Sequence, residues 1–316
     1  MKKLLLLLFV HLIFFSGESK KEGIDAIPEK EERNSILWKI EKDDQISYLF
    51  GTTHIMCEDQ MKYKDILDAL VKEVDVIVFE SDDDVEGDPM PYGKGIFGID
   101  IPESYKLKNF YSDADLLKLR SYYDDLNFND GIVDIIMNTD IVSASLIEVV
   151  FIMMDMDCDI TGSELYIESI NKGKEELYLE FTPEINDVTK RWIYYTYENI
   201  DISTMNIQAM IDYSKESYSE EALLDDMINY NNNDPQADLD DMLSLADPSD
   251  PNFEIYKVFI DGMNEFLLYE RNEMWMPRII NIMNDDKALF AVGSLHVLDL
   301  VERLEQKGYT LTPLDI

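Results

Sequence analysis

Basic residues are scarce in this chain of 316 residues. Lysine and arginine number 27 against 66 aspartates and glutamates, which gives a formal net charge of −39. A surface with this charge repels phosphate backbones, so we expect no nucleic acid among the partners. Hydrophobic residues still make up 46% of the chain, which is enough for a core and argues against disorder throughout.

Long apolar runs are also few, and the clearest stands at the N-terminus. Residues 1–19 combine a basic start, a short apolar stretch and small residues, which is the pattern of a secretory signal peptide. We therefore predict an exported protein (secreted, periplasmic or at the cell surface), with a flexible charged leader over residues 20–34. A signal segment that stays uncleaved would instead associate the chain with a membrane. A later run, residues 141–154, is broken by Glu148 and predicts a buried helix.

Cysteine is limited to Cys57 and Cys158. In an exported protein the two could form one disulfide, or they could remain two thiols, because the sequence gives no distance between them. Two common catalytic patterns are absent, namely the His-Glu-x-x-His of zinc-protease helices and the Gly-x-Ser-x-Gly of nucleophile elbows. The sequence therefore supports neither of those two enzyme classes.

Histidine occurs only three times, and two of the three share one local pattern. That pattern is Gly-x-x-His, found as Gly51-Thr52-Thr53-His54 and as Gly293-Ser294-Leu295-His296. Each motif follows a short apolar run that is typical of a buried strand. Histidine shuttles protons near neutral pH and is the commonest metal ligand. We therefore predict a two-histidine site assembled from both ends of the chain.

The spacing of the apolar residues predicts an α/β fold. Residues 36–50 indicate a β-hairpin, and a helical pattern then leads to a buried strand at 76–79. The C-terminal residues 288–314 repeat the order strand, helix, strand. We expect a single domain over residues 35–316, with a mixed central sheet formed from N-terminal and C-terminal β-α-β segments. A long helical insertion at about 105–285 separates these segments.

Two carboxylates and one arginine are further candidates for the site. Glu80 ends the strand-like run at 76–79, and Glu180 lies in a second short apolar run. Sites in open α/β sheets form where strands end, so we expect these acids to converge with the histidines. Arg271 follows a helical segment and could bind a substrate carbonyl or a site carboxylate. Glu80, Glu180 and Arg271 are therefore the predicted catalytic residues; alternatively, each is a solvated surface charge.

The residue types of this site suit a divalent metal ion. Two neutral imidazoles and a carboxylate are the ligands of many catalytic ions that keep an open coordination position. Such an ion lowers the pKa of water and so provides a nucleophile near neutral pH. We predict His54, Glu80 and His296 as the metal ligands, with manganese, cobalt or zinc as the ion.

Taken together, these residues resemble the TraB/GumN family, which is related to the Tiki extracellular metalloproteases. The resemblance runs from about residue 36 to the C-terminus and is carried by Trp38-Lys39-Ile40, residues 48–55, residues 76–80, Gly173-Lys174, Leu179-Glu180, Glu270-Arg271-Asn272, residues 291–296 and Lys307-Gly308-Tyr309-Thr310. It implies a secreted or membrane-associated α/β protein and metal-dependent peptide hydrolysis. His54, Glu80 and His296 match the family's site, and Glu180 and Arg271 match positions beside it. One departure is that residues 297–300 replace a Pro-Gly-containing loop of the family, which implies altered specificity or activity.

Three functions are compatible with these features. The first is a metal-dependent peptidase or amidase that acts on a peptide or protein substrate outside the cytoplasm. The second is a metal-free hydrolase of the erythromycin-esterase-like kind, with a histidine as general base. The third is a non-catalytic protein that binds a peptide or signal in the same cleft. The sequence leaves the substrate, the metal and the oligomeric state open.

Overall fold

The computed structural model describes most of the chain between residues 35 and 314. The described residues are 35–53, 56–57, 61–81, 102–141, 143–144, 147–148, 160–201, 205–217, 230, 235 and 251–314. The predicted signal peptide, residues 1–19, and the predicted leader, residues 20–34, lie outside them. In the part of the chain that the structure describes, no helix has the length and apolar character needed to cross a membrane.

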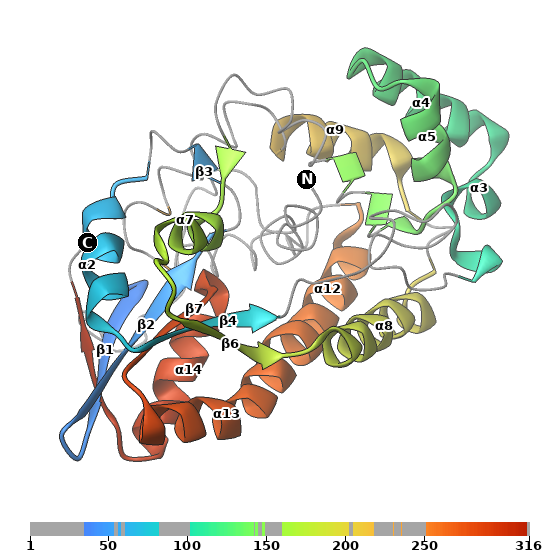
Figure 1. Cartoon of the computed structure of the whole chain (residues 1–316). Coiled ribbons are helices and arrows are strands. Elements are labelled where there is room, and N and C mark those ends of the chain that lie inside the picture. Colours follow the sequence, from blue (N-terminus) through green and yellow to red (C-terminus); the bar gives the residue numbers. More distant parts are fainter. Residues whose placement is uncertain are drawn as a thin grey trace, which may run out of the picture.

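The centre of the fold is a six-stranded mixed sheet (Figure 1). Across the sheet, the strands are β6 (Glu175–Glu180), β4 (Val76–Ser81), β7 (Ala288–Gly293), β2 (Gln45–Thr52), β1 (Leu37–Lys42) and β8 (Thr310–Pro313). The first four are mutually parallel, and β1 is antiparallel to both of its neighbours. A separate two-stranded sheet pairs β3 (Met56–Cys57) with β5 (Ile160–Thr161). Four carboxyl ends therefore meet along one edge of the large sheet.

The first two strands form the hairpin that the sequence predicts. Their register runs from Leu37 opposite Phe50 to Lys42 opposite Gln45, so only Asp43 and Asp44 make the turn. Both aspartates have positive φ angles, 48° and 68°. Positive φ at both central residues gives the turn a twist that matches the strands it joins.

Alternating side chains place a separate hydrophobic core on each face of the sheet. All six residues of the central strand β7 are buried. Leu289 and Ala291 belong to one core, whereas Ala288, Phe290 and Val292 belong to the other. This division follows from the two-residue period of a strand. A strand covered on both faces reads as a continuous apolar run, which is why residues 288–292 stand out in the sequence.

Helices cover both faces of the sheet. One face packs against α13 (Arg271–Asp285) and α14 (Ser294–Gln306), which contribute Ile279, Leu300 and Leu304 to its core. The other face packs against α2 (Lys64–Glu73) and α7 (Ser163–Ile170). Figure 1 shows these helices on opposite sides of the strands.

The other helices whose bounds the structure gives belong to the long insertion between β4 and β7. They are η2 (Glu103–Tyr105), α3 (Leu107–Phe110), α4 (Asp113–Asp125), α5 (Asp130–Met137), α8 (Thr182–Asn199), α9 (Ile207–Ser217), α12 (Phe253–Gly262) and the π-helix η4 (Met263–Glu270). In Figure 1 the arrows of β4 and β6 point toward this helical part. The predicted α/β class with a helical insertion is confirmed. One strand of the sheet, β6, comes from inside the insertion and pairs with β4.

Candidate functional site

The two Gly-x-x-His motifs follow neighbouring parallel strands. Strand β2 leads to the first motif and β7 leads to the second. Their register places Gly51 beside Val292 and Thr52 beside Gly293. The beginnings of the two motifs therefore lie side by side, although about 240 positions separate them in the sequence. His54 itself lies outside the described residues, so its place in the site stays a prediction.

Gly51 permits close packing between β2 and the helix that carries the second histidine. A Cβ atom at this position would stand 2.9 Å from Cγ2 of Val297 and 3.0 Å from Cα of Ser294. It would also lie 3.2 Å from Cβ of Ile36. Ser294 is the first residue of α14, and its backbone cannot turn aside as a flexible side chain can. The glycine is therefore required by packing at the sheet–helix contact.

We expect the Gly51→Ala variant to lose about 1–3 kcal/mol of unfolding free energy, which is the usual cost of overpacking. Because α14 must shift to admit the methyl group, the change should also disturb His296. Urea unfolding followed by circular dichroism measures the loss. The control is Gly131→Ala, since a Cβ there meets only the Asn129 side chain, at 3.1 Å. Equal stability of the two variants would contradict the packing role.

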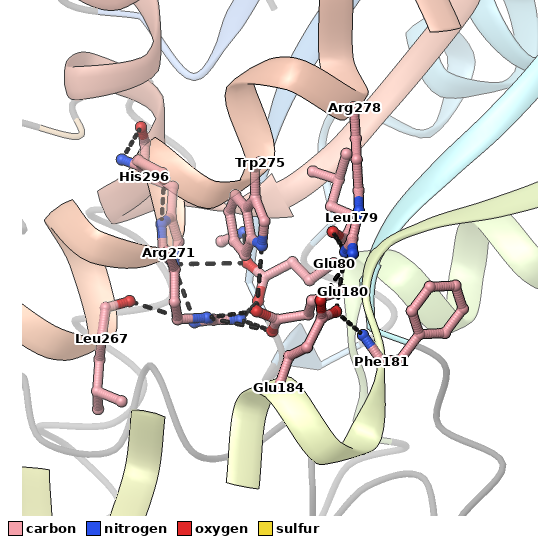
Figure 2. A network of polar contacts seen from close by, with 12 residues as sticks. Glu80, Leu179, Glu180, Phe181, Glu184, Leu267, Arg271, Trp275, Arg278 and His296 are labelled. Carbon is pink, nitrogen blue, oxygen red and sulfur yellow. Dashed lines mark hydrogen bonds and ion pairs between the residues drawn. The ribbon is translucent and has the colours of Figure 1, made fainter. Parts of the chain in front are cut away.

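His296 lies in the first turn of α14, directly after β7. Its side chain is fully buried, and its ring centroid is 4.5 Å from that of Trp275. Nδ1 lies 2.7 Å from Oδ1 of Asn272. On the other side of the ring, Nε2 lies 3.2 Å from Nη1 of Arg271 and 3.8 Å from Oε1 of Glu80. The imidazole is thus held at both nitrogens, as Figure 2 shows for the Arg271 side.

Glu80 lies at the end of β4 and connects that strand to its neighbour β7. Its Oε1 accepts a hydrogen bond from the Gly293 amide at 2.6 Å. Its Oε2 accepts a hydrogen bond from Nη2 of Arg271 at 2.7 Å. Only 11% of the Glu80 side chain is exposed, so both bonds act in a largely water-free environment. The predicted convergence of Glu80 with His296 at the strand ends is found in the structure.

Glu180 and Arg271 form a fully buried ion pair. Arg271 donates from Nη2 to Oε1 of Glu180 at 2.6 Å, and from Nε to both carboxylate oxygens at 3.1 and 3.2 Å. The indole Nε1 of Trp275 donates to Oε2 of Glu180 at 3.1 Å. The exposed fractions of the two charged side chains are 2% for Arg271 and 1% for Glu180. Figure 2 shows the guanidinium pointing toward the carboxylates of both Glu80 and Glu180.

The electrostatics of this cluster follow from its burial. Burial raises the pKa of Glu180, and the charge and hydrogen bonds of Arg271 oppose that rise. Burial alone would lower the pKa of Arg271, but the negative charges of Glu180 and Glu80 outweigh it and raise the pKa. The guanidinium therefore stays positive and acts as a fixed donor. Together, these contacts give Glu180 the role of holding Arg271 in place.

Arg271 stands where a π-helix becomes an α-helix. Helix η4 ends at Glu270 and α13 begins at Arg271. Nη1 of Arg271 also donates to the Leu267 carbonyl at 3.3 Å, within that π-helix. Segments of π-helix are rare and occur frequently at functional sites.

Three residues of the site have no counterpart among the predicted ones. Asn272 contacts His296, Trp275 contacts Glu180, and Asp299 accepts a hydrogen bond from Nδ2 of Asn272 at 2.8 Å. One sequence signal could have found Trp275, because it lies four positions after Arg271 and so shares its helix face. The Arg271 guanidinium carbon lies 4.6 Å from the Trp275 ring centroid. Asn272 adjoins Arg271 in the sequence, but nothing local connects it with a histidine 24 positions later.

Among the described residues, His296 and Glu80 could serve as two ligands of a divalent cation. An imidazole nitrogen and a carboxylate oxygen 3.8 Å apart have the donor types and spacing of two ligands on one ion. With both carboxylates ionised, Glu80, Glu180 and Arg271 carry one net negative charge, which a cation would offset. Within the described residues, no group of three or more His, Cys, Asp or Glu side chains is arranged to hold an ion. The third predicted ligand, His54, lies outside that part of the chain.

Cys57 is disulfide-bonded. It lies in β3, three positions after His54. The only other cysteine in the sequence is Cys158, which lies outside the described residues. Of the two alternatives that the sequence leaves open for Cys57, a disulfide or a thiol, the structure therefore has the disulfide.

The comparisons with known proteins agree with the resemblance seen in the sequence. The model of the TraB/PrgY/gumN family matches residues 36–313. This range includes both Gly-x-x-His motifs, both site glutamates and Arg271. No curated protein and no solved structure matches the chain significantly. Because the family model covers most of its length, the chain belongs to the TraB/PrgY/gumN family.

Proposed function

We propose that the protein is a metal-dependent hydrolase of peptide or amide bonds that acts outside the cytoplasm. The observation that carries the proposal is the pair of donor atoms formed by His296 Nε2 and Glu80 Oε1, 3.8 Å apart at the strand ends. His54 is the proposed third ligand, since β2 and β7 bring both motifs to the same edge of the sheet. A manganese, cobalt or zinc ion held there would supply Lewis acidity and lower the pKa of water.

The remaining residues of the site would orient the ligands and the substrate. Arg271 and the Gly293 amide hold the two oxygens of Glu80 in fixed directions. Glu180 and Trp275 in turn hold the Arg271 guanidinium, which keeps a positive charge beside the reacting groups. Such preorganised charge can stabilise a developing oxyanion on a substrate carbonyl. The catalytic roles proposed for Glu80 and Arg271 rest on this arrangement, and Glu180 acts by positioning Arg271.

Action outside the cytoplasm has two supports. Residues 1–19 have the pattern of a signal peptide. Cys57 is disulfide-bonded, and disulfides persist mainly in oxidising compartments. The high negative charge would favour neutral or basic peptides over acidic ones, through attraction that weakens with salt.

Metal analysis of the purified protein tests the proposal. After loading with manganese, cobalt or zinc and dialysis, we expect one bound ion per chain in the wild type. The variants His54→Ala, His296→Ala and Glu80→Gln should lose it. Glu184→Gln is the matched control, since Glu184 lies near the site but pairs with Arg278 at 2.7 Å. Unchanged metal content in both histidine variants would remove the proposal.

One observation favours a metal-free hydrolase as the second candidate. Nη1 of Arg271 lies 3.2 Å from His296 Nε2, which is within hydrogen-bond distance. The nitrogen that would bind a metal ion therefore already has a partner within the protein. A peptide and ester cleavage screen with and without a chelator separates the candidates. Activity that the chelator abolishes supports the metal enzyme, and activity that survives supports histidine as general base. Saturable peptide binding without turnover would instead indicate a binding protein.

A further inference from the structure

We propose that Asn272 is a positioning residue that fixes the buried His296 in its Nδ1–H tautomer. This tautomer places the lone pair of the imidazole on Nε2, the nitrogen that faces Glu80 and Arg271. The inference deepens the proposed function and rests on it for its catalytic meaning. The tautomer itself is a property of the protein without metal or substrate.

The orientation of the Asn272 amide determines which of its atoms meets the ring. Its Nδ2 lies 2.8 Å from Oδ2 of Asp299 and 3.4 Å from the His296 carbonyl oxygen. Both of these oxygens accept hydrogen bonds, so the amide NH2 must face them. The amide oxygen then faces His296 Nδ1, at 2.7 Å. A carbonyl oxygen only accepts, and therefore Nδ1 must carry the proton.

The opposite side of the ring leads to the same tautomer. Arg271 lies 3.2 Å from Nε2 and offers only N–H donors. Because the nearby carboxylates raise the pKa of Arg271, its guanidinium keeps all of its protons. Nε2 is therefore the acceptor in this contact. Two independent partners, Asn272 and Arg271, agree on one protonation pattern.

A chain of hydrogen bonds fixes the Asn272 amide from behind. Asp299 lies one turn after His296 in α14 and accepts a hydrogen bond from Nε of Arg303 at 2.6 Å. Asn272 is fully buried, whereas the side chains of Asp299 and Arg303 are 20% and 25% exposed. The series Arg303–Asp299–Asn272–His296 thus runs from the surface to the site. Partners of this kind commonly orient histidines that bind metals or transfer protons.

Nitrogen-15 NMR of histidine-labelled protein tests the inference directly. The chain has only three histidines, and His296→Ala identifies the signals of the third. In metal-free wild type above neutral pH, we expect the chemical shifts of a neutral Nδ1–H imidazole for His296. Asn272→Leu keeps a similar volume but leaves the buried Nδ1–H without its acceptor, so we expect part of the His296 signal to move to the Nε2–H tautomer, although Arg271 still donates toward Nε2. The signals of the other histidines should not change.

Asp299→Asn is the matched control. Its new amide oxygen can still accept from Asn272, so His296 should keep the Nδ1–H tautomer although one charge is lost. We also expect metal affinity to fall about 10- to 100-fold in Asn272→Leu and much less in Asp299→Asn.

The wild-type spectrum decides the proposal even where Asn272→Leu does not fold. An Nε2–H signal in the wild type, or an unchanged Nδ1–H signal in Asn272→Leu, would overturn it. If the tautomer changes as expected while the wild type binds no metal, Asn272 keeps its positioning role and the metal-dependent function fails.

Discussion

Replacement of Arg271 by methionine is expected to lower the unfolding free energy by about 3–5 kcal/mol and to abolish activity. The variant keeps most of the side-chain volume but removes the only cation that contacts both Glu80 and Glu180 among the described residues. Glu80 and Glu180, both largely removed from water, would then lose the guanidinium that binds them both. The loss reflects the removal of this cation from beside two carboxylates more than the net strength of the original ion pair. Urea unfolding at neutral pH measures it.

The pH dependence of Arg271→Met gives a sharper test. Without the guanidinium, the close carboxylates should share a proton, and their pKa in the folded state should lie above that in the unfolded state. The folded variant then binds more protons than the unfolded one, so its stability should fall as pH rises from about 5 to 8. The double variant Arg271→Met with Glu180→Gln should recover part of the loss. A stability loss that is independent of pH and is not rescued would contradict this account.

Arg278→Met is the control for Arg271→Met because both arginines belong to helix α13. Arg278 pairs with Glu184 at 2.7 Å, but these side chains are 35% and 38% exposed. Water screens such pairs, so we expect a loss of no more than about 1 kcal/mol. A similar loss of unfolding free energy in both variants would mean that the burial of Arg271 does not explain its contribution to stability.

The parts of the site that the sequence predicts are those with a local signal. An apolar run followed by glycine and histidine marks the ends of β2 and β7, and the run before Glu80 marks the end of β4. Parallel strands must bring such ends to one edge, so the meeting of these segments follows from the fold class. The structure adds the physical reason for the first glycine, which is the close approach of α14 to Gly51.

The remaining parts depend on contacts between distant segments. Asn272 lies in the first turn of α13, directly after the π-helix η4, and no residue pattern in 263–270 predicts that π-helical geometry. The edge position of β6 depends on its pairing with β4 across the insertion. The partners of Glu180, Arg271 and Trp275, lie 91 and 95 positions later in the sequence. The spacing of apolar residues in the sequence predicts where strands and helices end, whereas tertiary packing determines which side chains meet at those ends.

Replacement of Glu148 by glutamine is expected to stabilise the protein at pH 8 by up to about 3 kcal/mol. Glu148 interrupts an apolar run whose predicted helix is seen in its described residues, and its side chain is buried. It accepts hydrogen bonds from the hydroxyl groups of Tyr122 and, at 3.5 Å, Tyr123, both in α4. Burial raises the pKa of Glu148 to about 7, and the hydrogen bonds of Tyr122, Tyr123 and Ser214 oppose that rise.

The sign of this effect follows from the raised pKa. In the unfolded chain the carboxyl should titrate near its ordinary value of 4.5, so between about 4.5 and 7 the folded state holds a proton that the unfolded state has released. The contribution of Glu148 to stability is therefore complete below pH 4.5 and is lost as pH rises through 7. Glutamine stays neutral and can still accept from Tyr122, so its advantage over the wild type should be small at pH 4 and largest at pH 8.

Unfolding curves in urea at several pH values measure the difference between Glu148→Gln and the wild type. Asp124→Asn removes one charge from an exposed position on α4, the helix that carries Tyr122 and Tyr123, and controls for the net charge of the chain. That control should shift stability by only a few tenths of a kcal/mol at any pH, since surface charges contribute little. If wild type and Glu148→Gln lose stability in parallel from pH 4 to pH 8, the buried carboxyl does not release its proton on unfolding. The tyrosine hydroxyls would then hold Glu148 ionised in the folded protein at acidic pH as well.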